Sequence, residues 1–188
     1  MKLKAMTVQN NIEENEPQLS QSVLELLTVA TEFCRQVERE DQTTAQDLID
    51  VMLILLPMVY LKTSLVNDAE PVDGFNENKV TEGDYNLVRN RIAAILGDQD
   101  SYLDVFVQEF KYSDRPILCT VSEDLADMYQ ALREFVECYR WGNEEVRQVA
   151  LADLKDNYKL YWGQKLLNAL RAIHDIKYGD KAFDEETE

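Results

Sequence analysis

The chain has 188 residues, of which 45% are hydrophobic and 29% charged, and its 36 acidic against 19 basic residues give a formal net charge of −17. This length suits one domain with a hydrophobic core, and the apolar content excludes a chain that is disordered throughout. The negative charge disfavours direct binding to nucleic acids and to anionic membranes, whose phosphates attract basic proteins. We therefore expect no nucleic-acid or membrane partner, and a protein partner would be basic or neutral.

Composition divides the chain into three parts. Residues 1–18 are polar and lack a helical period, so they are predicted to form a flexible N-terminal tail, and the mostly acidic residues 180–188 a C-terminal tail. Residues 19–179 carry the apolar periodicity and are predicted to form a single helical bundle domain. Most of the acidic excess lies in this domain, so the acidity belongs to the folded body as well as to the tails.

The three cysteines, Cys34, Cys119 and Cys138, lie far apart among apolar residues. They lack the close spacing of zinc or redox motifs, so buried free thiols in a reducing compartment are expected. The first residues contain no apolar signal segment, and the longest apolar run, Val51–Leu61, is too short to span a bilayer. We expect a cytoplasmic protein without a cofactor, and the sequence carries no indication of its oligomeric state.

The first two helices are predicted from apolar residues at three- and four-residue steps. One helix covers Val23–Val37, with Ser20 or Ser22 as its N-terminal cap. A second helix begins at Thr43 or Thr44, whose hydroxyl groups can accept hydrogen bonds from the free amides of its first turn.

The second helix is apolar on both faces as far as Val59. Leu53, Ile54 and Met58 lie opposite the residues that would face the core, so this helix is predicted to be central in the bundle. Pro57 removes a helical hydrogen bond and clashes with the preceding turn, which predicts a kink.

A long acidic connection, Asn67–Val80, follows and is predicted to be a mobile loop. Thr81 and Asp84 resemble a capping box, and they open a helix that Gly97 can close. A shorter helix is expected around Tyr102, Leu103, Phe106 and Phe110, and a turn at Lys111–Pro116.

The next helix has the cleanest period, from Leu118 to Tyr139, and Gly142 is expected to end it. Asn143 then caps a helical pattern that extends to Tyr178, which would be about 54 Å long against roughly 30 Å for a small domain. A break is therefore predicted near Gly163. The fold class is all-α, a single-domain bundle of six or seven mostly antiparallel helices with a kink at the proline.

Several kinds of catalysis are disfavoured. His174 is the only histidine, and its place after apolar helical residues is typical of a structural side chain, not of a catalytic pair. The residue three positions before it is Arg171, so the Glu-x-x-His motif of di-metal bundles is absent.

One set of carboxylates suits a magnesium site. Glu134 and Glu137 on one helix, with Asp153 and Asp156 on the next, match the pattern of all-α enzymes that cleave nucleoside triphosphates. Acidic pairs at this spacing are no more common than the composition alone predicts, so solvated helix faces explain them as well.

Polar residues also interrupt the apolar patterns of three predicted helices. Those of the last helix follow at steps of four and three, acids gather in the first turns of the helix at 118–139, and a lysine ends the second helix. These residues either form an ion-pair network, in which Arg171 or Lys62 pairs with the acids, or line a semi-buried pocket with aromatic walls for a small ligand or peptide. The candidates are Tyr60, Lys62, Tyr112, Asp114, Glu123, Asp124, Asp127, Trp162, Gln164, Asn168 and Arg171.

The candidates fall in short motifs, which are Leu56-Pro57 with Tyr60-Leu61-Lys62, Lys111-Tyr112-Ser113-Asp114, Ser122-Glu123-Asp124-Leu125-Ala126-Asp127, and Tyr161-Trp162-Gly163-Gln164 with Asn168-Ala169-Leu170-Arg171 and His174. In these motifs the sequence resembles a bacterial all-helical family catalogued only as a domain of unknown function. The resemblance spans about residues 22–175, and Tyr-Trp-Gly-Gln is its most specific part. It implies a single-domain bacterial cytoplasmic protein and supplies no catalytic residues.

Three functional hypotheses follow. The first is a non-enzymatic acidic helical interaction or adaptor module that binds a basic or neutral partner. The second is a magnesium-dependent nucleotide pyrophosphohydrolase-like enzyme built on the four carboxylates. The third is an acidic mimic of nucleic acid that competes with DNA for a basic protein.

Overall fold

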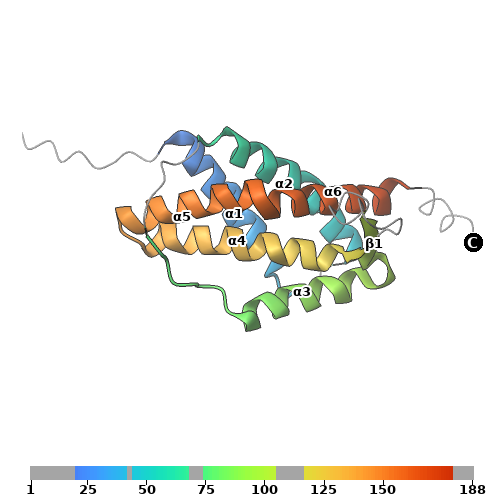
Figure 1. The fold of residues 1–188 in the computed structure, drawn as a ribbon. Coiled ribbons are helices and arrows are strands. Elements are labelled where there is room, and N and C mark those ends of the chain that lie inside the picture. The colour runs from blue at the N-terminus through green and yellow to red at the C-terminus, as the bar shows by residue number, and fades with distance from the viewer. Residues whose placement is uncertain (1–19, 42–43, 68–73, 105–116, 180–188) are drawn as a thin grey trace, which may run out of the picture.

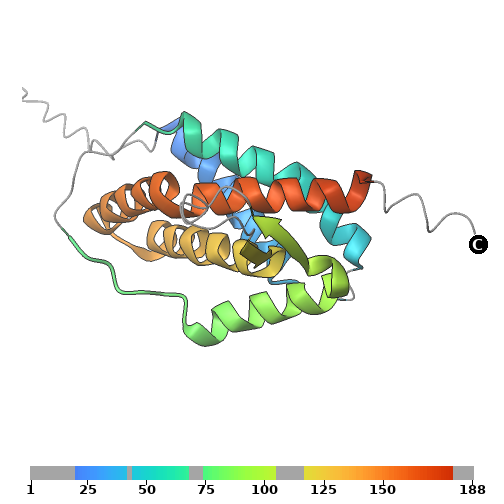
Figure 2. The same cartoon turned by 45° about the vertical axis from the view of Figure 1, so that its right-hand side comes forward.

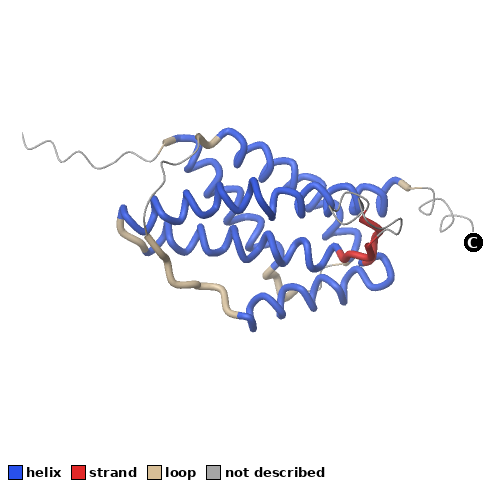
Figure 3. The backbone as a smooth tube through the Cα atoms, in the orientation of Figure 1, coloured by secondary structure: helices blue, strands red, loops and turns tan. Residues whose placement is uncertain are grey.

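The structure, a computed structural model, describes residues 20–41, 44–67, 74–104 and 117–179, so the two predicted tails lie outside the described residues. The described residues form five helices, counting α5, η3 and α6 as one, and a two-stranded sheet (Figures 1 and 3). The elements are α1 (Gln21–Val37), α2 (Ala45–Leu65), α3 (Glu82–Leu96), η1 (Gly97–Asp100), β1 (Ser101–Asp104), β2 (Ile117–Thr120), α4 (Val121–Trp141), α5 (Glu144–Asn157), η3 (Tyr158–Trp162) and α6 (Gly163–Tyr178). The all-α class is confirmed, whereas the described residues form fewer helices than the six or seven that were predicted.

The centre of the bundle is α4. It packs against α1, α3, α5 and α6, whereas α2 packs mainly against α1 and α6. Twelve of the 21 residues of α4 are buried, against seven of 21 in α2. The prediction that the second helix is central was therefore wrong, because its second apolar face lies on the surface. This helix continues past Pro57 to Leu65, and the kink itself stays a prediction.

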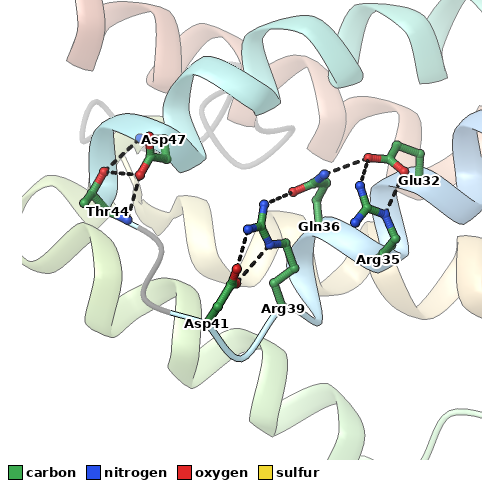
Figure 4. A network of polar contacts seen from close by, with 7 residues as sticks. All are labelled: Glu32, Arg35, Gln36, Arg39, Asp41, Thr44 and Asp47. Atoms are coloured by element: carbon green, nitrogen blue, oxygen red, sulfur yellow. Dashed lines mark hydrogen bonds and ion pairs between the residues drawn. The ribbon is translucent and has the colours of Figure 1, made fainter.

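Most of the predicted helix ends are confirmed. Thr44 and Thr81 each form a capping box with an aspartate three residues later, and Figure 4 shows the first of these with Asp47. Gly97 adopts a φ of 55°, a conformation that favours glycine, and it ends α3. Asn143 accepts a hydrogen bond from the first turn of α5. Local side-chain chemistry therefore sets these boundaries.

A short β-hairpin replaces part of the predicted helical structure. β1 and β2 pair antiparallel, with Tyr102 opposite Cys119, where a helix around residues 102–110 was expected (Figure 2). The predicted start of the following helix at Leu118 is also wrong, because that residue lies in β2 and α4 begins at Val121. The apolar spacing of such a short segment fits a strand as well as a helix, and the pairing decides between them. The predicted turn at 111–116 lies outside the described residues.

Near Gly163, where a break was predicted, the α-helix is interrupted but the chain stays helical. A π-helical turn at Tyr158–Trp162 joins α5 to α6, and the amide of Gly163 donates to the carbonyl of Tyr158, five residues earlier. A Cβ atom on this glycine would lie 2.4 Å from that carbonyl oxygen and 2.9 Å from Cδ2 of the tyrosine ring. The glycine therefore permits the wider turn, and the helix runs on along α4 in the opposite direction (Figure 1).

Candidate functional site

Among the described residues, the most buried ionisable side chain lies in the first turn of α4. The side chain of Asp124 is 1% exposed and accepts a hydrogen bond from the hydroxyl of Tyr102 on β1. Its other oxygen, Oδ1, lies 3.1 Å from Nζ of Lys165 on α6. The sheet, α4 and α6 therefore all contribute to one polar centre.

Asp127 extends this centre by one turn of α4. Its carboxylate accepts hydrogen bonds from the hydroxyls of Tyr85 at 2.9 Å and of Tyr161 at 2.6 Å, and Nζ of Lys165 lies 3.7 Å away. The two aspartates share a helix face because they are three residues apart. We call these six residues the aspartate cluster, which comprises Tyr85, Tyr102, Asp124, Asp127, Tyr161 and Lys165.

Burial determines the electrostatics of the aspartate cluster. It raises the pKa of Asp124 to about 6, although the hydrogen bond from Tyr102 and the charge of Lys165 act in the opposite direction. Burial alone would lower the pKa of Lys165, but the neighbouring carboxylates raise it above its ordinary value. Burial and Asp127 together raise the pKa of Tyr85, so its hydroxyl stays a donor. The cluster holds one cation against two carboxylates.

Further polar contacts fix the surroundings of the aspartate cluster. The buried Asp100 accepts hydrogen bonds from the backbone amide and the hydroxyl of Ser122, at 2.8 Å and 2.6 Å. The side-chain amide nitrogen of Asn168 donates to Asp104 at 3.0 Å, and its side-chain oxygen accepts a hydrogen bond from the side chain of Gln164 at 3.2 Å. These contacts tie η1 to the first turn of α4, and the hairpin to α6.

The remaining candidate residues lie in several places. Trp162 is fully buried and donates to the carbonyl of Leu154 at 3.2 Å, so it belongs to the core. Lys62 pairs with Glu25 on α1 at 2.7 Å, away from the aspartates. Glu123 and Arg171 are exposed, and Tyr60 contacts the ring of Tyr158 with the centroids 5.7 Å apart. Tyr112 and Asp114 lie outside the described residues.

The four carboxylates of the magnesium hypothesis do not converge. Glu137 pairs with Arg133 at 3.0 Å, and Asp156 lies 3.9 Å from Lys159. Within the described ranges, no group of three or more histidine, cysteine or acidic side chains is placed to hold a metal ion. The geometry therefore gives this hypothesis no support, although two of the four side chains, Glu134 and Asp153, line one cavity.

That cavity has a volume of about 210 Å³ and lies between α4, α5 and the segment 74–80, which we call the strap. Its apolar wall includes Phe135 and Leu154. Its polar lining residues are Asn76, Asn78, Gln130, Glu134, Asp153 and Asn157. We call it the strap cavity.

The strap is held at three points, although a mobile loop was predicted for residues 67–80. Both oxygens of Glu134 accept hydrogen bonds from the amide of Lys79, at 2.7 Å and 2.8 Å, and one also accepts from Val80. The side chain of Asn76 donates to the carbonyl of Val146 at 3.0 Å. At Gly74 the strap lies so close to α5 that a Cβ atom would be 2.6 Å from Val149. Residues 68–73 lie outside the described residues.

A third feature is the apolar outer face of α2. Ile54, Met58, Leu61 and Leu65 follow at steps of four, three and four and are 63%, 40%, 53% and 56% exposed. Leu24 of α1 is also exposed. By length and composition, α2 is the one described helix that could cross a membrane, with 39% of its apolar window buried, but a core helix of a soluble protein meets the same criteria.

The sequence identified the two aspartates of the cluster but not the cation between them. Lys165 follows Gln164 in the first turn of α6 and precedes two leucines, a position at which a lysine is usually solvated. Its one signal is its position four residues after Tyr161, which puts both on one helix face. Tyr85 and Tyr102 gave no signal, because nothing in their local pattern indicates that they meet α4.

The fold and its contacts define a helical bundle with a buried polar centre, a polar cavity and an apolar outer face. Residues 17–179 match the family model described as a domain of unknown function (DUF5063), so the chain belongs to that family. The structure is similar to the crystal structure of protein BF1032 from Bacteroides fragilis, with 37% sequence identity, a TM-score of 0.76, and coverage of 87% of this chain and 96% of that one. A search of curated proteins gives no match.

Proposed function

We propose that the protein is a non-enzymatic interaction module that binds an amphipathic helix of a partner protein with neutral or positive net charge. The docking surface is the outer face of α1 and α2, which we call the α1–α2 face. The observation that carries the proposal is the exposed apolar row of α2, since contiguous exposed apolar surface marks interaction sites.

The spacing of the row favours a helical partner. Steps of four and three place Ile54, Met58 and Leu61 on one stripe, which is the seam that a second helix packs against. Beside this stripe a groove of about 580 Å³ lies between the two helices. Its lining residues include Leu27, Thr28, Thr31, Leu55 and Met58.

The threonines make this groove less polar than its composition indicates. The hydroxyl of Thr28 donates to the carbonyl of Leu24 at 2.8 Å, and that of Thr31 donates to Leu27 at 2.7 Å. Their hydrogen bonds are therefore made within α1, and a partner helix loses little by covering them.

Charge narrows the choice of partner. The charged residues at the edges of the α1–α2 face are paired with each other, as in the pairs Lys62 with Glu25, Arg35 with Glu32 and Lys177 with Asp50 (Figure 4 for the second pair). The local surface is therefore close to neutral on a chain of net charge −17. A second copy or an anionic membrane meets long-range repulsion from the same body, whereas a neutral or basic partner does not.

Site-specific photo-crosslinking in cells tests the proposal. The crosslinking amino acid p-benzoylphenylalanine replaces Leu61 in one full-length variant and Leu87 of α3 in the control, because the two leucines are similarly exposed, at 53% and 56%. We expect a crosslinked partner from position 61 only. The partner, once identified, is purified and titrated against the wild-type protein and against Leu61→Asp and Leu87→Asp variants.

The proposal requires that Leu61→Asp weakens binding of the purified partner by about tenfold or more, as expected for a buried apolar contact, while Leu87→Asp does not. Equal crosslinking from both positions would overturn it. So would a dimer of this chain, measured by light scattering, that Leu61→Asp dissociates, or binding to neutral lipid vesicles that depends on the same residue.

A further inference from the structure

We propose that the strap cavity is a binding site for a small organic cation, an alkylammonium or alkylguanidinium group, with its charged head at Glu134 and Asp153. The site is separate from the α1–α2 face, and neither proposal depends on the other. The proposal for the strap cavity rests on the charge of the cavity, on its size and on the contacts that anchor the strap.

The charge of the cavity favours a cation. Two of its lining side chains, Glu134 and Asp153, are carboxylates, and none of the described residues that line it is basic. Asp153 is exposed at the mouth of the cavity, and partial burial, and then the neighbouring Asp156, raise its pKa, so the carboxylate there lacks the stabilisation that a cation supplies. The acidic body adds a long-range attraction for positive ligands.

The size and lining of the cavity favour an organic ion over a metal ion. A volume of about 210 Å³ has room for several water molecules and is too large for one bare ion. The oxygens of Glu134 already accept hydrogen bonds from the strap, so fewer positions remain for a coordination shell. Phe135 and Leu154 offer an apolar wall for methylene groups, and four carboxamides offer both donors and acceptors.

The anchoring of the strap makes the site preformed. Asn76 lines the cavity and at the same time donates to the carbonyl of Val146, while the strap backbone beyond it is held by Glu134. A ligand therefore meets a strap backbone, and two side chains, that are already held in place, and less conformational entropy is lost on binding. The same carboxylate, Glu134, thus anchors the strap and forms part of the wall.

Calorimetric titration of the full chain tests the proposal, with butylammonium and butylguanidinium as probes and 1-butanol, butyrate and magnesium chloride as comparisons. All titrations are made at 0.15 M salt, which screens non-specific attraction to the acidic surface. The variant is Asp153→Asn, and the matched control is Asp156→Asn, the same substitution one turn further along α5 and outside the lining.

We expect both cations to bind the wild-type protein, and Asp153→Asn to weaken them about tenfold or more, as for a lost hydrogen bond to a charged group. Asp156→Asn should leave the affinity within about twofold. Nuclear magnetic resonance should place the probe at the carboxamide signals of Asn76, Gln130 and Asn157. Unchanged far-UV circular dichroism and melting temperature confirm that both variants fold.

Several results would overturn the proposal. These are no measurable binding of either cation, equal weakening by both substitutions, equal binding of 1-butanol, or magnesium that displaces butylammonium from the cavity. Equal weakening would indicate attraction to the acidic surface as a whole, and displacement by magnesium would assign the cavity to a metal ion.

Discussion

The ammonium group of Lys155 on α5 lies 2.8 Å from the carbonyl oxygen of Thr63, in the last turn of α2. It also donates to the carbonyl of Val66 at 2.7 Å, and the lysine is only 5% exposed. The carbonyl groups at the end of a helix have no partner within the helix, and they attract positive charge. One lysine therefore donates hydrogen bonds to two carbonyl groups at the end of α2 and joins this helix to α5.

The first prediction concerns this lysine. Lys155→Met keeps the apolar stem but removes the lysine donor from the carbonyl of Val66 and leaves the carbonyl of Thr63 with only the backbone amide of Val66. The free energy of unfolding should therefore fall by roughly 2–3 kcal/mol. Urea denaturation measures the change. The matched substitution Lys159→Met, at a lysine whose side chain is 48% exposed, should have little effect. Equal effects at the two positions would show that the carbonyl contacts do not stabilise the fold.

The second prediction concerns the π-helical turn. Gly163→Ala places a Cβ atom against the carbonyl and ring of Tyr158, so it should destabilise the protein by roughly 1–3 kcal/mol. Gly83→Ala, in the exposed first turn of α3, meets nothing closer than 3.4 Å and should be neutral or stabilising, by up to about 1 kcal/mol. Thermal and urea unfolding of both variants measure this contrast, and a stable Gly163→Ala variant would contradict it.

The third prediction is a pH dependence. Asp124 takes up a proton more readily in the folded protein, where its pKa is about 6, than in the unfolded chain, where it is near 3.8. Its contribution to stability is therefore fully present below pH 4 and is lost as the pH rises through 6. Relative to the wild type, Asp124→Asn should gain stability on the order of 3 kcal/mol between pH 4 and pH 7.

Urea unfolding of the wild type and of Asp124→Asn across this pH range measures the effect. The other carboxyl groups titrate in both proteins, so their contribution cancels in the difference between the two free energies of unfolding. Tyr102→Phe removes a hydrogen bond that lowers the pKa of Asp124, so it should move the change to higher pH. A difference between wild type and Asp124→Asn that does not vary with pH would contradict the prediction.

The fourth prediction compares two lysines that each pair with acids across helices. Lys165→Met leaves Asp124 buried without its cation and should lower the free energy of unfolding by roughly 3 kcal/mol at neutral pH. Lys62→Met breaks only the solvent-accessible pair with Glu25, so the urea midpoint should hardly change. If the two variants unfolded at the same urea concentration, the assignment of the buried cation to Lys165 would be wrong.

Local patterns in the sequence predicted the helices with distinctive ends. Thr44, Thr81 and Asn143 cap helices where the sequence placed caps, because a cap depends on residues three positions apart. The hairpin was missed because its two strands have four residues each and pair across the segment 105–116. The π-helical turn was missed because a hydrogen bond between residues five apart depends on how the ring of Tyr158 packs.

The candidate site was predicted in part for a related reason. Asp124 and Asp127 stand out in the sequence as acids among apolar residues, but their partners come from α3, β1, η3 and α6. Which lysine reaches them depends on helix packing, and the choice of Lys62 or Arg171 used position along the chain alone. The apolar face of α2 was visible in the sequence but was assigned to the interior.

The π-helical turn also sets the rotational phase of the last helix. It adds one residue to a turn, and each residue of an α-helix rotates the chain by about 100°, so every side chain of α6 is turned by that angle relative to α5. With this offset, Asp153 faces the strap cavity while Lys165, twelve residues later, faces the two aspartates of α4. Deleting one residue from the turn would rotate that ammonium group about a quarter of a revolution away from the aspartates, so the turn at Tyr158–Trp162 fixes the angle between the two polar sites.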